Sequence, residues 1–225
     1  MTTEQLGVTG GAATATEAAA GVRRIGQLEV SVAGLGCNNF GRRIDQARAR
    51  EVVAAALDAG VTMFDTADVY GDGLSEEFLG GALGTQRHNV VITSKFGYAQ
   101  PPDGLSGGDP RWIPRACEAS LRRLGTDHID LYLLHRPDPV IPVADTLGAM
   151  SDLVDQGKVR EIGCSNFSAS QLSEAASTAE ERLRRFVALQ NEYSLLQRTP
   201  EHGVLQRCSE LEMAFIPYSR SPMAC

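Results

Sequence analysis

Short apolar runs recur along the chain, and each is followed by a longer segment whose apolar residues return at helical spacing. The short runs predict β-strands and the longer segments predict helices, because the two elements differ in length and period. The strands are expected at residues 32–36, 61–64, 89–95, 129–134, 159–164, 186–189 and 214–216. Strands that alternate with helices form parallel sheets with right-handed crossovers. The pattern therefore predicts an α/β fold with about seven parallel strands.

The first part of the chain departs from this alternation. Val22–Ile25 and Leu28–Val30 flank a two-residue turn, a spacing that is typical of a β-hairpin. Before the hairpin, residues 7–20 are rich in glycine, alanine and threonine and offer little apolar surface for a core. We therefore expect a disordered tail over residues 1–21 and one folded domain over residues 22–225.

Capping residues mark several of the expected helices. Asp45 is placed as the N-cap of a helix over residues 45–58. Pro114 opens a later helix that Gly125 ends, and Ser168 caps the helix after the fifth strand. These positions fix where the helices are expected to begin and end.

Two further segments are expected to be helical, residues 75–83 and residues 201–211. The first contains Gly80 and Gly81. Each glycine costs a helix about 1 kcal/mol relative to alanine. We therefore expect close packing against this helix.

Polar residues at the ends of the expected strands decide between two parallel-sheet architectures. A doubly wound dinucleotide fold requires G-x-G-x-x-G at the first strand-to-helix turn. Gly34-Leu35-Gly36 matches the first half, but Asn39 stands where the third glycine belongs, and no helix is expected there. The later strands end instead in polar side chains: Asp65, Lys95, His135, Ser165, Asn166, Gln190 and Tyr218. Such ends converge when the strands close into a ring, so we predict a (β/α)8 TIM-type barrel.

Composition and charge narrow the functional classes. The chain has 225 residues and a formal net charge of −7, whereas a general nucleic-acid binder carries a basic patch. Its five cysteines are scattered and include no C-x-x-C pair, which is typical of a reduced protein without disulfides or a zinc site. No run of about 18 apolar residues is present, and the first residues lack the pattern of a secretory signal. We therefore expect a cytoplasmic protein with no metal, no membrane span and no nucleic-acid partner.

Four of the polar residues form a set that suits protonation of a carbonyl oxygen. Tyr70 lies in the loop after Asp65, and an unperturbed tyrosine pKa of about 10 is too high for efficient proton donation near neutrality. We expect the Lys95 ammonium to lower the pKa of Tyr70, and Asp65 to hold Lys95 in place and charged. His135 can hydrogen-bond the carbonyl oxygen. No side chain donates hydride, so this chemistry requires a nicotinamide.

The remaining polar strand ends suit a nicotinamide. Ser165, Asn166 and Gln190 offer hydroxyl and amide groups that can hold a carboxamide. Tyr218 offers a flat face for stacking. Both halves of a hydride-transfer site are thus expected at one end of the barrel.

The motifs around these residues resemble those of the aldo-keto reductase family. In chain order they are Phe64-Asp65-Thr66-Ala67 to Tyr70-Gly71, Thr93-Ser94-Lys95, Asp130 to His135, Gly163 to Phe167, and Gln190 to Tyr193. The match runs from about Val22 to Ser219 and is most similar to bacterial members related to potassium-channel β subunits. The resemblance implies a (β/α)8 barrel that reduces small-molecule aldehydes and ketones to alcohols with NADP(H) as the cofactor.

The resemblance also implies a role for each site residue. Tyr70 would be the general acid, Lys95 and Asp65 would tune it, and His135 would orient the carbonyl group. The implied cofactor-binding residues are Ser165, Asn166, Gln190, Tyr218 and Ser219.

The C-terminal end departs from the family pattern. After Pro217-Tyr218-Ser219 the family usually continues with Pro-Leu and a glycine-containing loop, whereas this sequence reads Arg220-Ser221-Pro222-Met223-Ala224-Cys225. A complete barrel has about 250 residues, so we expect a chain truncated before its eighth βα unit. The family's basic loop for the cofactor 2′-phosphate would then be missing, which predicts weak cofactor affinity and little preference for NADPH over NADH. Open strand edges would favour self-association.

Three functional hypotheses therefore remain open at this point. The first is a carbonyl reductase, with Tyr98 and Trp112 near the long loop 97–110 as candidates to line its substrate pocket. The second is a non-catalytic remnant or binding subunit of the same fold. The third is a lyase or aldolase that uses Lys95 as a Schiff base.

Overall fold

A curled parallel sheet organises the molecule. The computed structural model describes residues 21–179 and 183–219. Within them the strands of the sheet are β3 Gly34–Gly36, β4 Met63–Asp65, β5 Val91–Phe96, β6 Ile129–Leu134, β7 Val159–Ser165, β8 Ala188–Glu192 and β9 Ala214–Tyr218. Each strand pairs in parallel with the next one along the chain.

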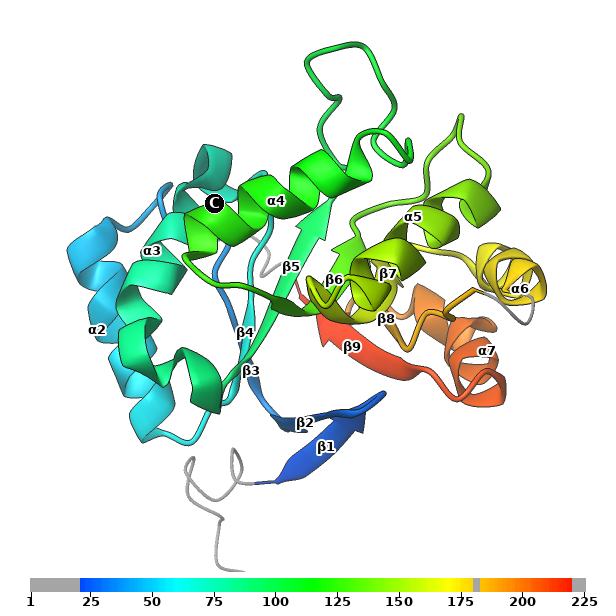
Figure 1. The fold of residues 1–225 in the computed structure, drawn as a ribbon. Coiled ribbons are helices and arrows are strands. Elements are labelled where there is room, and N and C mark those ends of the chain that lie inside the picture. Colours follow the sequence, from blue (N-terminus) through cyan, green and yellow to red (C-terminus); the bar gives the residue numbers. More distant parts are fainter. Residues whose placement is uncertain (1–20, 180–182, 220–225) are drawn as a thin grey trace, which may run out of the picture.

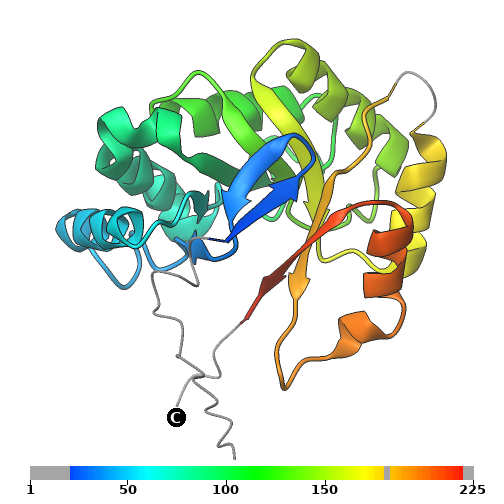
Figure 2. The same cartoon turned by 90° about the horizontal axis from the view of Figure 1, so that it is seen from below.

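Helices cover the outer face of this sheet, as Figures 1 and 2 show. They are α2 Gln46–Asp58, α3 Leu74–Leu83, α4 Ile113–Leu124, α5 Val143–Asp155, α6 Ala169–Thr178 and α7 Val204–Glu210. The strand order and the outer helices confirm the predicted barrel architecture, and the sheet is an incomplete barrel. Among the described residues, β3 and β9 each pair on one side only.

A two-stranded hairpin lies across one end of the curled sheet (Figure 2). Its strands are β1 Val22–Ile25 and β2 Leu28–Ser31, paired antiparallel as predicted. Ile25, Leu28 and Val30 are buried against apolar residues that point inside the barrel, such as Leu131. The hairpin therefore closes the amino-terminal end of the barrel, and the opposite end holds the polar strand termini.

The expected tail over residues 1–21 lies outside the described residues except for Gly21. The Gly21 carbonyl accepts a hydrogen bond from the Val32 N–H at 2.7 Å, which fastens the start of the hairpin. None of the described helices has the length and apolar character that a membrane crossing requires.

Local sequence signals explain several helix boundaries. The Asp45 carboxylate accepts from the Arg48 N–H at 2.9 Å, and Ser168 forms a reciprocal capping box with Gln171. Gly80 is also explained, because a Cβ there would stand 2.2 Å from the Leu124 carbonyl oxygen on α4. The expected close packing of α3 is therefore confirmed, through Gly80.

One predicted helix is shorter than expected. The segment 201–211 was predicted as one helix, but a 3-10 turn over Thr199–Glu201 comes first and α7 begins only at Val204. Gly203 separates them with a φ of +106°, a conformation that is incompatible with a continuous right-handed helix.

Candidate active site

The carboxyl ends of β4, β5 and β6 bring four of the expected residues to one place. Asp65 ends β4, Lys95 is the penultimate residue of β5, and His135 directly follows β6. Tyr70 begins a 3-10 turn, Tyr70–Gly73, between β4 and α3. Parallel strands that point the same way therefore place an acid, a cation and an imidazole beside the phenol.

Lys95 is the centre of this group. Its Nζ donates to Asp65 Oδ2 at 2.7 Å, to the Thr66 carbonyl oxygen at 2.8 Å and to the Tyr70 hydroxyl at 3.3 Å. The lysine side chain is fully buried, whereas 18% of the Asp65 side chain is exposed. A buried ammonium requires such partners, so Lys95 is held by an ion pair and two hydrogen bonds.

The pKa values of this group follow from burial and charge. Burial alone would lower the pKa of Lys95, but the Asp65 carboxylate and the Tyr70 hydroxyl outweigh it and raise that pKa above its usual value. Lys95 therefore carries a full positive charge.

For Tyr70 the Lys95 charge acts in the expected direction, but the net pKa shift is upward. Burial raises its pKa, and the nearby Lys95 charge and hydrogen bond only partly offset this effect. Tyr70 therefore keeps its proton, and Lys95 is placed as a partner that can stabilise the phenolate once the proton has left.

His135 lies beside Tyr70 as a neutral imidazole. The two rings meet edge to face with their centroids 5.8 Å apart. Burial, aided by the charges of Lys95 and Arg136, lowers the pKa of His135 to about 3. Its Nδ1 is buried and has no hydrogen-bond partner among the described residues. A buried polar atom without a partner requires an explanation, and a bound polar group is one.

The turn that carries Tyr70 is shaped by two glycines. Gly71 has a φ of +58° and Gly73 a φ of +94°. A Cβ on Gly71 would stand 2.7 Å from the Phe40 carbonyl oxygen, and one on Gly73 would stand 2.8 Å from Arg123 Cδ. The turn therefore fits between two segments that leave no room for a side chain, which sets the position of the phenol.

Four of the five expected cofactor-binding residues form a connected network at the ends of β7, β8 and β9. Asn166 Nδ2 donates to the His135 carbonyl oxygen at 2.9 Å, and Asn166 Oδ1 accepts from the Tyr218 hydroxyl at 2.7 Å. Ser165 Oγ donates to the Gln190 carbonyl oxygen at 2.7 Å. Asn166 adopts a φ of +62°, which a short polar side chain tolerates.

Gln190 joins this network to the acid group. Its Nε2 donates to Asp65 Oδ1 at 3.0 Å, so one carboxylate serves both Lys95 and Gln190. Ser219 follows β9 and is exposed. The two sets of expected residues are thus continuous in space, with Asp65 as the link.

Several polar groups near the site were not predicted from the sequence. Glu76 is fully buried and accepts from Ser94 Oγ at 2.5 Å and from Arg123 Nε at 2.6 Å. Burial and the nearby Glu76 charge raise the pKa of Asp68 to about 7, with Arg123 acting in the opposite direction. No pattern in the sequence marks Glu76, because its partners come from β5 and α4.

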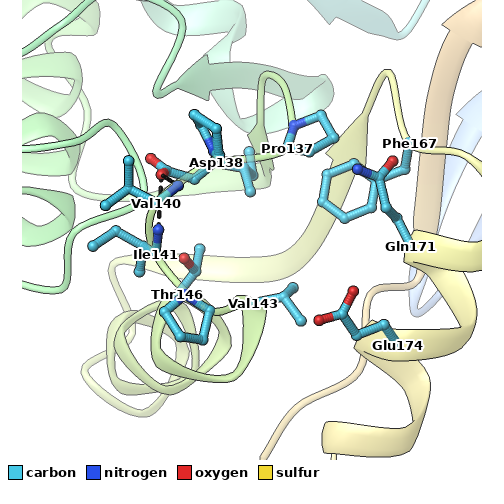
Figure 3. Close-up of a pocket in the computed structure, with 12 residues that line it drawn as sticks. Pro137, Asp138, Val140, Ile141, Val143, Thr146, Phe167, Gln171 and Glu174 are labelled. Atoms are coloured by element: carbon cyan, nitrogen blue, oxygen red, sulfur yellow. Dashed lines mark hydrogen bonds between the residues drawn. The ribbon is translucent and has the colours of Figure 1, made fainter.

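A separate surface cavity of about 320 Å³ lies between the loop after β6 and the helices α5 and α6 (Figure 3). The cavity is not lined by any of the four residues of the candidate site, Asp65, Tyr70, Lys95 and His135. Asp138 at its rim accepts from the backbone N–H groups of Val140, Ile141 and Gly108 at 2.7–2.9 Å. Burial is outweighed by the hydrogen bond from the Ser106 hydroxyl together with these backbone bonds, which lower the pKa of Asp138, so its carboxylate ties the loop after β5 to the loop after β6.

No group of three or more histidine, cysteine or acidic side chains in the described part of the chain could hold a metal ion. Four cysteines, Cys37, Cys117, Cys164 and Cys208, are buried free thiols.

Comparison with known proteins defines the class. The family model for the aldo/keto reductase family matches residues 33–223. The chain belongs to that family.

Solved structures of similar proteins show the same architecture. The aldo-keto reductase AKR11C1 from Bacillus halodurans, in its holo form, is 31% identical with a TM-score of 0.77, and the match covers 87% of this chain and 65% of that one. An aldo-keto reductase from Klebsiella pneumoniae in complex with NADPH is 33% identical with a TM-score of 0.74, covering 85% and 64%. A further structure of an aldo/keto reductase from Klebsiella pneumoniae, in complex with NADP and acetate, is 33% identical with a TM-score of 0.74, and the match covers 85% of this chain and 65% of that one. The chain thus spans just under two thirds of the length of these relatives.

Proposed function

We propose that the protein reduces aldehydes or ketones to alcohols with NADPH, and that Tyr70 is the proton donor. The observation that carries the proposal is the Tyr70 hydroxyl at 3.3 Å from the Lys95 ammonium, which is itself paired with Asp65 at 2.7 Å. A structural relative from Klebsiella pneumoniae was solved with NADPH, which supports the cofactor. The balanced reaction converts a carbonyl compound, NADPH and a proton into an alcohol and NADP⁺.

In this proposal the residues act on the carbonyl oxygen. The Nδ1 atom of His135 lacks a partner, and the neutral ring can hydrogen-bond that oxygen and orient it beside Tyr70. Tyr70 then transfers its proton to the oxygen as negative charge develops there. Lys95 stabilises the resulting phenolate, and Asp65 keeps the ammonium charged and in place.

The polar network at β7–β9 fits a nicotinamide. A bound NADPH supplies the hydride. Gln190 Oε1 accepts no hydrogen bond from any described residue, so it can accept from the carboxamide, while Ser165 and Asn166 border the same region. We assign Tyr218 to stacking on the ring and Ser219 to the adjoining part of the cofactor.

Two assays on the purified chain test the proposal. Quenching of NADPH fluorescence measures cofactor binding, and loss of NADPH absorbance with 4-nitrobenzaldehyde measures turnover. Tyr70→Phe is expected to lower kcat by at least about a thousandfold while leaving NADPH affinity within about twofold, because the change removes the proton donor alone. Turnover by Tyr70→Phe at the parent rate would exclude Tyr70 as the acid.

One structural feature favours a second candidate, a binding subunit without activity. All residues of β9 are at least partly accessible, and the strand pairs on one side only in the described residues. Such an edge can associate with another chain, including a second copy. Sedimentation analysis tests this candidate: a monomer that turns over substrate would contradict it.

The Schiff-base hypothesis is disfavoured by the charge state of Lys95. A lysine nucleophile must be neutral, but Asp65 and Tyr70 raise the pKa of Lys95. Borohydride in the presence of a carbonyl compound is therefore expected to leave no covalent adduct on the protein.

The buried free thiols fit the reducing cytoplasm, which we propose as the location.

A further inference from the structure

A row of side chains leads from the proposed carbonyl site to the surface. The Tyr98 ring lies 4.9 Å from the His135 ring, centroid to centroid. The Arg136 guanidinium lies over the same Tyr98 ring, 4.8 Å from its centroid. Tyr98 is 44% exposed and Arg136 is exposed as well, so the row ends in solvent at the mouth of the site.

The charge of Arg136 is not matched by a carboxylate. No acidic side chain in the described part of the chain lies within ion-pair distance of Arg136, and no hydrogen bond from its guanidinium to a described residue is formed. The positive charge of Arg136 acts on His135, because it contributes to lowering the pKa of that imidazole. The guanidinium is thus held near the reacting group by an aromatic face, with its donors available.

A second arginine, Arg115, provides the contrast. Arg115 also lies over an aromatic ring, 5.2 Å from the centroid of Trp112. Its guanidinium, however, donates to the Asp103 carboxylate, which neutralises it. Arg115 and Arg136 therefore have the same kind of aromatic partner, but only Arg115 is also paired with a carboxylate.

We propose that Arg136 recognises a carboxylate on the substrate, so that the preferred substrates are aldehydes or ketones that carry an anionic group. This inference rests on the proposed carbonyl reduction. The planar guanidinium fork binds a carboxylate through two parallel hydrogen bonds, and Tyr98 fixes its orientation. The carbonyl oxygen would lie at Tyr70 and His135, and the carboxylate would lie along the Tyr98 ring at Arg136. The carboxylate is unchanged by the reaction.

A matched pair of substrates isolates this contact. 4-Carboxybenzaldehyde and methyl 4-formylbenzoate have similar size and reactivity, but only the first carries a negative charge. For Arg136→Met we expect kcat/KM for 4-carboxybenzaldehyde to fall about tenfold, mainly through KM, and kcat/KM for the ester to stay within about twofold. Arg136→Lys is expected to fall between the parent and Arg136→Met, because it keeps the charge and loses the fork.

Arg115→Met is the control for charge alone. It removes a positive charge from another arginine that packs on an aromatic ring and leaves Arg136 in place, so kcat/KM is expected to stay unchanged for both substrates. An equal loss in Arg115→Met and Arg136→Met would overturn the proposal in favour of general electrostatic attraction. An equal loss for acid and ester in Arg136→Met would overturn it in favour of a structural role.

Two further measurements separate the remaining sources of an anion. If NADPH affinity, measured by fluorescence quenching, falls in Arg136→Met while the ratio of acid to ester is unchanged, Arg136 binds a cofactor phosphate and the proposal is wrong. Binding of 4-(hydroxymethyl)benzoate, measured by calorimetry, requires no turnover. It is expected to weaken about tenfold in Arg136→Met even if carbonyl reduction itself fails its own test, and unchanged binding would overturn the proposal.

Discussion

The two halves of the candidate site are built in different ways. The acid half, which consists of Asp65, Tyr70, Lys95 and His135, lies at the ends of β4, β5 and β6. Every residue of β5 and β6 is buried. The other half ends at β9, where no residue is fully buried. In the first half an ion pair inside the core fixes the functional atoms, whereas in the second half polar side chains near an edge strand hold one another.

This difference predicts how each half responds to substitution. Removing one charge from a buried pair leaves the other charge without compensation, and the free energy of unfolding falls. Removing one hydrogen bond near the surface exposes its partner to water, and little stability is lost. The acid half is therefore tied to folding, and the other half is expected to affect ligand binding more than stability.

The largest effect is expected for Asp65→Asn. The substitution keeps the shape of the side chain and removes the charge that compensates the fully buried Lys95. We expect the free energy of unfolding to fall by about 3–5 kcal/mol, measured by urea denaturation at neutral pH. The double variant with Lys95→Met is expected to recover part of this loss, because it leaves no unpaired charge.

Asp72→Asn is the matched control for this prediction. Asp72 is an exposed carboxylate on the same turn as Tyr70, and its φ of +55° is one that asparagine also accepts. We expect its free energy of unfolding to stay within about 0.5 kcal/mol of the parent. If Asp65→Asn and Asp72→Asn lowered the free energy of unfolding equally, the loss in Asp65→Asn could not be assigned to the buried ion pair with Lys95.

A smaller effect, with a distinct pH dependence, is expected for Asp68→Asn. Part of Asp68 reaches the surface, but its Oδ1 is enclosed and has no partner among the described residues. Burial and Glu76 raise its pKa from 3.8 to about 7, so the folded state binds a proton more tightly than the unfolded chain does. The contribution of the protonated carboxyl is therefore present below about pH 4 and is lost as the pH rises through 7.

The measurement is urea denaturation of both proteins across this range. Asp68→Asn cannot ionise, so it is expected to match the parent near pH 4 and to exceed it by up to about 4 kcal/mol above pH 7. A constant difference between the two proteins from pH 4 to pH 8 would show that Asp68 does not titrate in this way.

Features encoded by neighbouring residues could be predicted from the sequence. Asp45 and Ser168 mark helix starts because each side chain accepts a hydrogen bond from a backbone N–H three residues further on. The strand order followed from the alternation of apolar runs with helical segments. The placement of Asp65 and Lys95 at neighbouring strand ends followed in turn from the parallel sheet.

Features that depend on distant contacts could not be predicted. Glu76 pairs with Arg123, 47 positions along the chain, and nothing local marks either residue. The net rise of the Tyr70 pKa was missed because it comes from burial, which outweighs the expected lowering by Lys95 and exists only in the packed molecule. The break before α7 was missed because a glycine is compatible with many conformations, and tertiary structure selects the positive φ of Gly203.

The smallest effect on stability is expected for Tyr218→Phe, in the half of the site near the edge strand. The change removes the hydroxyl that donates to Asn166 Oδ1 at 2.7 Å and keeps the aromatic ring. Because this contact is accessible to water, we expect the free energy of unfolding to fall by less than about 1 kcal/mol.

The ring remains for stacking, so NADPH affinity is expected to stay within about threefold of the parent, whereas Tyr218→Ala should weaken it by about tenfold or more. Fluorescence quenching and urea denaturation on the same samples separate the two effects. A loss of several kcal/mol in Tyr218→Phe would show that this half of the site is also tied to folding, and the contrast between the two halves would no longer hold.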